Sequence, residues 1–356
     1  MSGLQPPLPS TMPKQMIGRP ANPHAVMKDA VRQSASRRTN WLLLPLCFAL
    51  ATLYIGFFRG VFGIENFPDL QNYRNFFEGG YYIFILQRMS GLEYITSEAT
   101  WSYFVDFFRL RNFEIYEILF ISSVVSLGSA LYYVYVNTRN PLNFLFFLNP
   151  LSMDLYVGQN RSALASGLFL LALTVRNPTL RLALMLFAGT FHISIFILTA
   201  LYVLHWAYLK INEKFPNNIH RVRFFVLTIL LVSVFSSFGR DITLYQLNDS
   251  RSNVLDGETS SWAYVAFWTT LVISYFALKK EDFTTIAPTM ILFCFSNFIL
   301  FTYTGNFSSR WAAYSIPFIA VVAGNIKGLG KEFFLVQYFI IASVAYVYWI
   351  NQAQVL

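Results

Sequence analysis

Long apolar runs alternate along this chain with short polar segments. Each run is continuous and lacks the two-residue alternation of an outer-membrane strand, which favours helices. A helix needs about 20 apolar residues to cross a bilayer. Runs of roughly this length predict spanning helices near residues 41–59, 112–136, 141–157, 161–176, 222–238, 261–278, 284–303, 310–326 and 333–350.

The run at residues 181–209 is longer than one span requires. Basic residues flank it on both sides, at Arg181 before it and Lys210 after it. Because lysine and arginine favour the cytoplasmic side, both ends are expected to be cytoplasmic. The run therefore predicts a broken helical hairpin that bends near residues 188–192. Broken helices at membrane depth line cavities, so His192 is expected at the tip, facing a polar space.

These elements predict an all-α polytopic membrane protein with about 9–12 transmembrane helices, including the broken re-entrant hairpin. The N-terminus is expected to be cytoplasmic. The segments around residues 60–111, 154–161, 239–261 and 304–310 then fall on the outer face, as does the C-terminus. Two shorter semi-apolar pieces between residues 81 and 110 are typical of re-entrant or interfacial segments.

Composition agrees with this fold class. Only 12% of the residues are charged, about half the share in a soluble globular protein. The transmembrane domain is expected at residues 41–356. Residues 1–40 are rich in proline and basic side chains, which predicts a flexible cytoplasmic tail that contacts anionic lipid headgroups.

The remaining composition limits the chemistry. The net charge of +8 follows from loop and tail residues that set orientation, so no nucleic-acid partner is expected. Cys47 and Cys294 both fall inside apolar runs and are interpreted as small buried hydrophobes. No metal-ligand spacing is present in the sequence, and no cofactor is expected.

Two arginines lie at the mouths of apolar runs, which is an expensive position for a cation and indicates function. Arg161 follows Asn160 after a short break and is expected to begin a helix. A helix N-terminus attracts anions, and a guanidinium adds a fork that matches phosphate oxygens. Arg310 opens a later run after GNFSS, and it is expected to form a second phosphate clamp beside Arg161.

Other outer-face residues are candidates for proton transfer and sugar contacts. A neutral imidazole at His192 is a plausible general base, and Asp69 is the rival base. Tyr73 follows Asp69 at helical spacing and is a candidate for stacking on a sugar ring. In the charged loop at 239–261, Arg240 and Arg251 are expected to contact substrate as the loop closes. For each of these residues a purely structural role is the alternative.

In order along the chain, Asp69-x-x-x-Tyr73, Asn160-Arg161 within NPLSMDLYVGQNRSALASGLFLLAL, Phe191-His192-x-Ser194, and Arg310-x-x-x-Tyr314 resemble the EpsG/Wzy-type repeat-unit polymerases. The resemblance covers roughly residues 65–320. In that family one residue usually separates the asparagine from the arginine, whereas here the two are adjacent.

The resemblance implies a GT-C-like or O-antigen-polymerase-type helical bundle. It also implies a polyprenyl-diphosphate-dependent glycosyltransferase that polymerises undecaprenyl-diphosphate-linked oligosaccharide repeat units into O-antigen, capsule or exopolysaccharide. The expected location is the periplasmic face of the bacterial inner membrane. The implied partners are the lipid-linked donor and acceptor, membrane lipids and a chain-length regulator. His192, Arg161, Arg310 and Asp69 are then the expected catalytic residues, with substrate contacts from Tyr73, Asn160, Arg240, Arg251 and Tyr314.

Three other activities compete with this interpretation. A lipid-linked glycan flippase or exporter also needs arginines in a membrane cavity, although such proteins usually show internal repeats. An O-antigen ligase uses the same chemistry but transfers glycan to a lipid core. A membrane acyltransferase fits a lone histidine, but the sequence places no acidic residue beside it.

Overall fold

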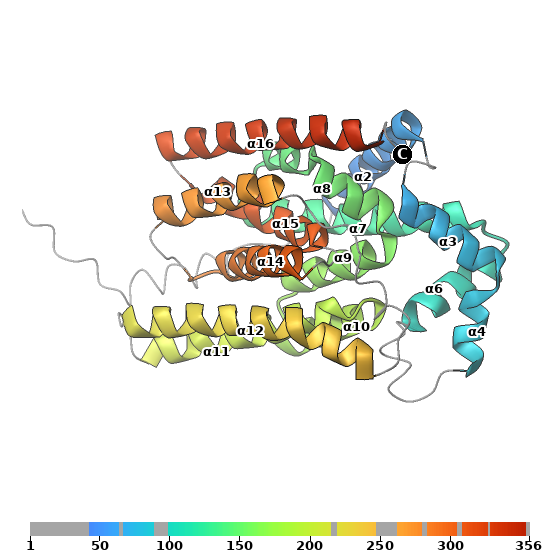
Figure 1. Ribbon diagram of the computed structural model, residues 1–356, viewed down its shortest axis with the longest axis horizontal. Helices are drawn as coiled ribbons and strands as arrows, with labels where there is room; N and C mark the ends of the chain where they lie inside the picture. Colours follow the sequence, from blue (N-terminus) through green and yellow to red (C-terminus); the bar gives the residue numbers. More distant parts are fainter. Residues whose placement is uncertain are drawn as a thin grey trace, which may run out of the picture. The chain divides into compact units, whose positions relative to one another are not determined.

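The computed structural model describes residues 43–63, 67–88, 99–214, 219–246, 262–279, 283–304, 308–326 and 328–353. Every regular element in these ranges is helical (Figure 1), which confirms the all-α fold class. The elements are α2 (Leu43–Phe62), α3 (Pro68–Glu78), α4 (Tyr81–Arg88), α6 (Ala99–Arg109), α7 (Ile115–Thr138), η1 (Pro141–Phe147), α8 (Pro150–Met153), η2 (Asp154–Gly158), α9 (Asn160–Thr174), α10 (Pro178–Phe191), α11 (Ser194–Lys214), α12 (Ile219–Gln246), α13 (Trp262–Lys279), α14 (Ile286–Tyr303), α15 (Ser309–Asn325) and α16 (Leu329–Ala353).

Six of these helices are long and apolar enough to cross a membrane: α2, α7, α11, α12, α14 and α16. The chain is therefore a multi-pass membrane protein. In α7 and α14, 72% and 67% of the apolar window is buried, so these two helices form the centre of the bundle. The corresponding share in the other four is between 22% and 33%, which leaves their outer faces for lipid.

The remaining expected spans correspond to shorter helices. α9, α10, α13 and α15 have between 14 and 18 residues. At about 1.5 Å per residue they reach roughly 21–27 Å, less than the ~30 Å hydrocarbon core. Hydropathy thus located these helices correctly. α9, α10 and α15 are shorter than any of the six, whereas α13 has the same 18 residues as α14.

The expected single span at residues 141–157 is wrong. The segment is divided into the 3₁₀ helix η1, the short helix α8 and the π-helical turn η2. Pro141 and Pro150 each begin a new element, because proline has no N–H to continue the helix before it. Asn149 makes the break stable, since its side chain accepts from Ser152 N at 3.0 Å. Irregular backbone is tolerated here because protein buries it, and Asn149 itself is fully buried.

The run at residues 181–209 does form a helical hairpin, with its break next to the expected position. α10 ends at Phe191, and α11 begins at Ser194. The two arms run antiparallel and side by side, as the hydrogen bond from Nη1 of Arg181 to the Tyr202 hydroxyl at 2.8 Å shows. Gly189 permits their close approach, since a Cβ there would lie 2.6 Å from the Phe196 ring.

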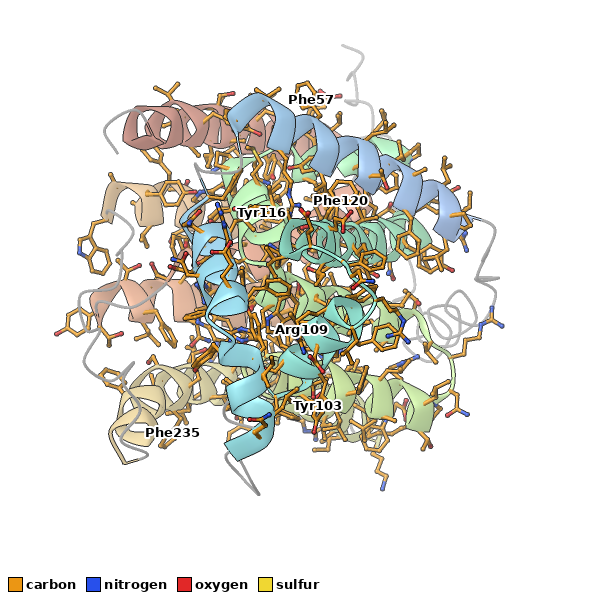
Figure 2. All side chains as sticks on the ribbon, turned by 90° about the vertical axis from the view of Figure 1, so that its right-hand side faces the viewer. Phe57, Tyr103, Arg109, Tyr116, Phe120 and Phe235 are labelled. Carbon is orange, nitrogen blue, oxygen red and sulfur yellow. The ribbon has the colours of Figure 1, made fainter. Side chains whose placement is uncertain are left out.

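The long helices alternate in direction, so the connections gather at two ends of the bundle (Figure 1). One end carries α3, α4 and α6 together with the N-termini of α7, α9 and α15. Figure 2 faces this end and shows Tyr103 and Arg109 of α6 lying over the ends of the long helices. We call it the site end, because the candidate residues described below lie there.

Candidate functional site

The Asn160–Arg161 pair begins α9, as expected from the break in the sequence. The preceding turn η2 is π-helical, a geometry that is frequent at functional sites. The backbone N–H of Arg161 donates to the Tyr73 hydroxyl at 3.3 Å. The N-terminus of α9 thus combines a helix dipole with a guanidinium, which together favour an anion.

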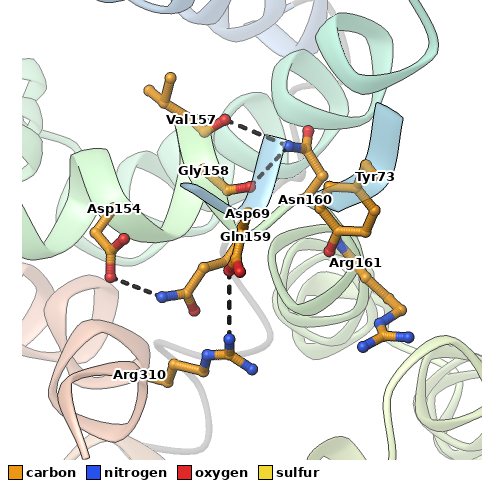
Figure 3. A network of polar contacts seen from close by, with 9 residues as sticks. All are labelled: Asp69, Tyr73, Asp154, Val157, Gly158, Gln159, Asn160, Arg161 and Arg310. Carbon is orange, nitrogen blue, oxygen red and sulfur yellow. Dashed lines mark hydrogen bonds and ion pairs between the residues drawn. The ribbon is translucent and has the colours of Figure 1, made fainter. Parts of the chain in front are cut away.

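Asn160 is fully buried and holds this turn in place (Figure 3). Its Oδ1 accepts from the hydroxyls of Ser122 and Ser123 in α7, at 3.0 and 2.8 Å. Its Nδ2 donates to the carbonyls of Val157 and Gly158, at 3.3 and 3.0 Å. These four contacts fill the hydrogen-bonding capacity of the amide. The structure therefore gives Asn160 a positioning role, and its contact with substrate stays a prediction.

Tyr73 lies on the same face of α3 as Asp69, as the spacing predicts. Its side chain is only 9% exposed, and its ring packs against Trp101 with centroids 5.5 Å apart. Burial raises the pKa of Tyr73 to about 12, so the phenol stays protonated near neutral pH. Its contacts anchor α3 to α9, and its stacking on a sugar stays a prediction.

Arg310 lies in the first turn of α15, again at a helix N-terminus. Its Nη2 donates to Oδ2 of Asp69 at 3.3 Å. Both side chains remain partly exposed, at 22% for Arg310 and 35% for Asp69. α3 therefore touches both arginine-bearing helix starts, through Asp69 on α15 and through Tyr73 on α9. Figure 3 shows the two guanidinium groups extending toward the same side of the network.

A second carboxylate lies in this network and was missed from the sequence. Asp154 opens the π-helical turn η2, and its Oδ2 accepts from Nε2 of Gln159 at 2.7 Å. In the sequence Asp154 lay at the end of an expected span, and a carboxylate in that position is the signal that could have marked it as part of a site. The wider π-helical turn brings residues five apart into contact and so joins Asp154 to Gln159.

His192 occupies the break between α10 and α11 in an extended conformation, with φ −156° and ψ 123°. It is half-buried. Two residues further on, the Ser194 hydroxyl hydrogen-bonds to the Tyr314 hydroxyl at 3.2 Å. Tyr314 lies one turn after Arg310 in α15, so this contact ties the hairpin break to the Arg310 helix. Tyr314 is buried, at 3% exposure, and its contact with substrate stays a prediction.

The side chains of the two arginines expected in the loop at 239–261 lie outside what the structure describes. Arg240 lies within α12, whereas Arg251 lies outside the residues that the structure describes. Their contacts with substrate stay predictions. In the described parts of the chain, no group of three or more histidine, cysteine or acidic side chains is arranged to hold a metal ion.

The site end therefore gathers two arginines at helix N-termini, two carboxylates and one histidine. Arginines at helix starts suit a di-anionic phosphate group, and histidine or a carboxylate suits proton transfer. The EpsG family model matches residues 41–355, almost the whole chain.

The chain belongs to the EpsG family. Membership supports a polysaccharide-polymerase type of activity and a glycosyltransferase-like enzyme in general. It also confirms the family suggested by the order of the sequence motifs. Comparisons with curated proteins and with solved structures find no match.

Proposed function

We propose that this EpsG-family protein polymerises oligosaccharide repeat units carried on a polyprenyl diphosphate, such as undecaprenyl diphosphate. The hydroxyl at the non-reducing end of one lipid-linked unit attacks the anomeric carbon of the growing chain. The bond from that carbon to the diphosphate oxygen breaks, and the lipid diphosphate leaves. The acceptor proton passes to a base in the site.

The observation that carries this proposal is the pairing of two arginine-bearing helix starts through one short helix. Asp69 reaches Arg310, and Tyr73 reaches the N-terminus that holds Arg161. A leaving diphosphate develops negative charge, and two guanidinium groups beside two helix dipoles stabilise such charge in the transition state. Arg161 and Arg310 are assigned to this role.

His192 is assigned as the base that takes the acceptor proton. It lies at an irregular break in the membrane domain, and Ser194 ties that break to the helix of Arg310. Asp69 is the alternative base, but its carboxylate already contacts Arg310. This contact already occupies Oδ2 of Asp69, which favours the imidazole as the base.

The charge distribution supports a site on the outer face of the inner membrane. Basic side chains gather at the helix ends opposite the site, at Arg139, Arg176, Arg181, Lys210, Lys214, Arg221, Arg223 and Lys331. At the site end, acidic residues offset the basic ones, among them Asp69, Glu78, Asp106, Glu114, Glu117 and Asp154. The positive-inside rule then assigns the basic end to the cytoplasm and the site end to the periplasm.

Purified protein in sealed lipid vesicles, supplied with a lipid-linked repeat unit, tests the proposal. A ladder of longer glycans on the lipid, absent with Arg161→Ala, is the expected result. A single transfer to a lipid core acceptor would identify a ligase. No covalent product, with movement of the glycolipid across the membrane, would identify a flippase.

A further inference from the structure

Arg59 is a buried cation at the last turn of α2, beneath the site. Only 9% of it is exposed. Its Nη2 donates to the Ser123 hydroxyl at 3.2 Å and lies 3.5 Å from the Val157 carbonyl. Its Nη1 donates to the Tyr116 carbonyl at 3.3 Å. All these acceptors are neutral, and no carboxylate among the described residues is paired with this guanidinium.

The fold itself gains little from this charge. The Val157 carbonyl also accepts from Asn160, and the Ser123 hydroxyl donates to Asn160. The Tyr116 carbonyl lies in α7, and a carbonyl within a helix normally accepts from the backbone N–H four residues later. Burying a cation without a counter-ion is costly in desolvation.

The contacts of Arg59 lead directly to the candidate anion site. The guanidinium donates to the Ser123 hydroxyl, and that hydroxyl donates to Oδ1 of Asn160, the residue before Arg161. It also approaches Val157 in the π-helical turn that leads into α9. Its Cζ lies 5.6 Å from the Phe120 ring centre, and Figure 2 shows Phe120 and Tyr116 on α7 beside α2. A charge buried here acts on a nearby ligand with little screening by salt.

We propose that Arg59 is a positioning residue that also supplies a third, buried positive charge for the diphosphate of the substrate. The inference rests on the proposed function, because it requires an anion at the N-termini of α9 and α15. Arg59 positions the η2 turn that leads into Arg161, and its buried charge adds positive potential at the N-terminus of α9. The bound negative substrate offsets the desolvation cost of the buried cation. Arg59 therefore favours substrate binding at the expense of the stability of the free protein.

The experiment measures thermal unfolding of the full-length purified protein with and without inorganic pyrophosphate, and pyrophosphate affinity at low and high salt. The variants are Arg59→Met, which keeps the volume and removes the charge, and Arg59→Lys, which keeps the charge. Arg111→Met is the matched control, since Arg111 is exposed at the same end and its guanidinium contacts Phe107, four residues earlier. Arg161→Ala tests the anion site itself.

Arg59→Met is expected to weaken pyrophosphate affinity about tenfold, as expected for one poorly screened charge, without lowering the unfolding temperature of the free protein. Arg59→Lys should retain most of the affinity, and Arg111→Met all of it. If Arg59→Met lowers the unfolding temperature or leaves the affinity unchanged while Arg161→Ala abolishes it, Arg59 is structural and only this inference fails. If wild-type protein shows no pyrophosphate binding, the anion site and this inference fail together.

Discussion

Asp69 and Arg310 are 241 positions apart in the chain, yet Oδ2 of Asp69 lies 3.3 Å from Nη2 of Arg310. Both side chains are partly exposed, and ion pairs of this kind contribute at most about 1 kcal/mol. The contact closes α3 onto the N-terminus of α15. A diphosphate carries more negative charge than one carboxylate, so it can displace Asp69 from Arg310.

Asp69→Asn is therefore expected to tighten pyrophosphate binding up to about fivefold, because the competing carboxylate is lost. Polymerisation should largely persist, since His192 is the assigned base. Isothermal titration with pyrophosphate measures the first effect. Asp106→Asn is the control, as Asp106 pairs with Arg109 at the same end. Weaker binding by Asp69→Asn would mean that Asp69 orients Arg310 instead of competing for it.

Arg161→Ala and Arg310→Ala should each lower polymer formation about 10²-fold or more while membrane insertion persists. Each removes a charged donor that is aimed at the leaving group in the transition state. Lysine at either position should restore little activity, because an ammonium lacks the bidentate fork. The glycan ladder formed from a lipid-linked unit measures the effect, with Arg111→Ala as the control. Full-length polymer from either alanine variant would remove that arginine from the diphosphate clamp.

His192→Gln and His192→Ala should lower the polymerisation rate about 10²–10⁴-fold, the usual contribution of a general base. Binding of the lipid-linked donor should remain, because the arginines are untouched. Single-turnover rates and donor binding, measured side by side, separate the two effects. His220→Gln, at an exposed position on α12, should behave as wild type. Near-normal rates in His192→Gln would make Asp69 the next base to test.

Tyr73 offers a prediction about pH. Burial raises the pKa of Tyr73 to about 12, so the folded protein keeps this phenol protonated where an unfolded tyrosine ionises near 10. Tyr73 therefore destabilises the folded state as pH rises from about 10 to 12. Tyr73→Phe should weaken that loss of stability in chemical unfolding measured at pH 9 and pH 11. An unchanged pH dependence would mean that the phenol is solvated in the folded protein.

The α10–α11 hairpin can be tested by cysteine labelling. Arg181→Cys and Lys210→Cys should both react with an impermeant maleimide from the same side of the membrane, the cytoplasmic one. The native Cys47 and Cys294 are buried, so an unsubstituted protein gives the background. Labelling of one position from the periplasm only would require the two arms to form a single span.

The sequence by itself determined the class of protein and most of its helices. Continuous apolar runs can satisfy their backbone groups in a membrane only as helices, which is why hydropathy located α2, α7, α12 and α14. The local sequence also predicted the helix starts at Asn160–Arg161 and Arg310 and the break beside His192. The ordered motifs led to the EpsG family, because spacing along the chain is a property of sequence alone.

Tertiary structure decided which of these groups meet. The expected span at 141–157 became three short elements, because proline and asparagine interrupt it and buried contacts of Asn149 compensate for the break. Asp154 and Arg59 are charged residues at the ends of expected spans, but only the packing of α2, α7 and η2 brought Arg59 under the site. The sequence did not predict that Asp69 pairs with Arg310. The two residues are 241 positions apart, and their contact depends on how the helices pack, which no local pattern encodes.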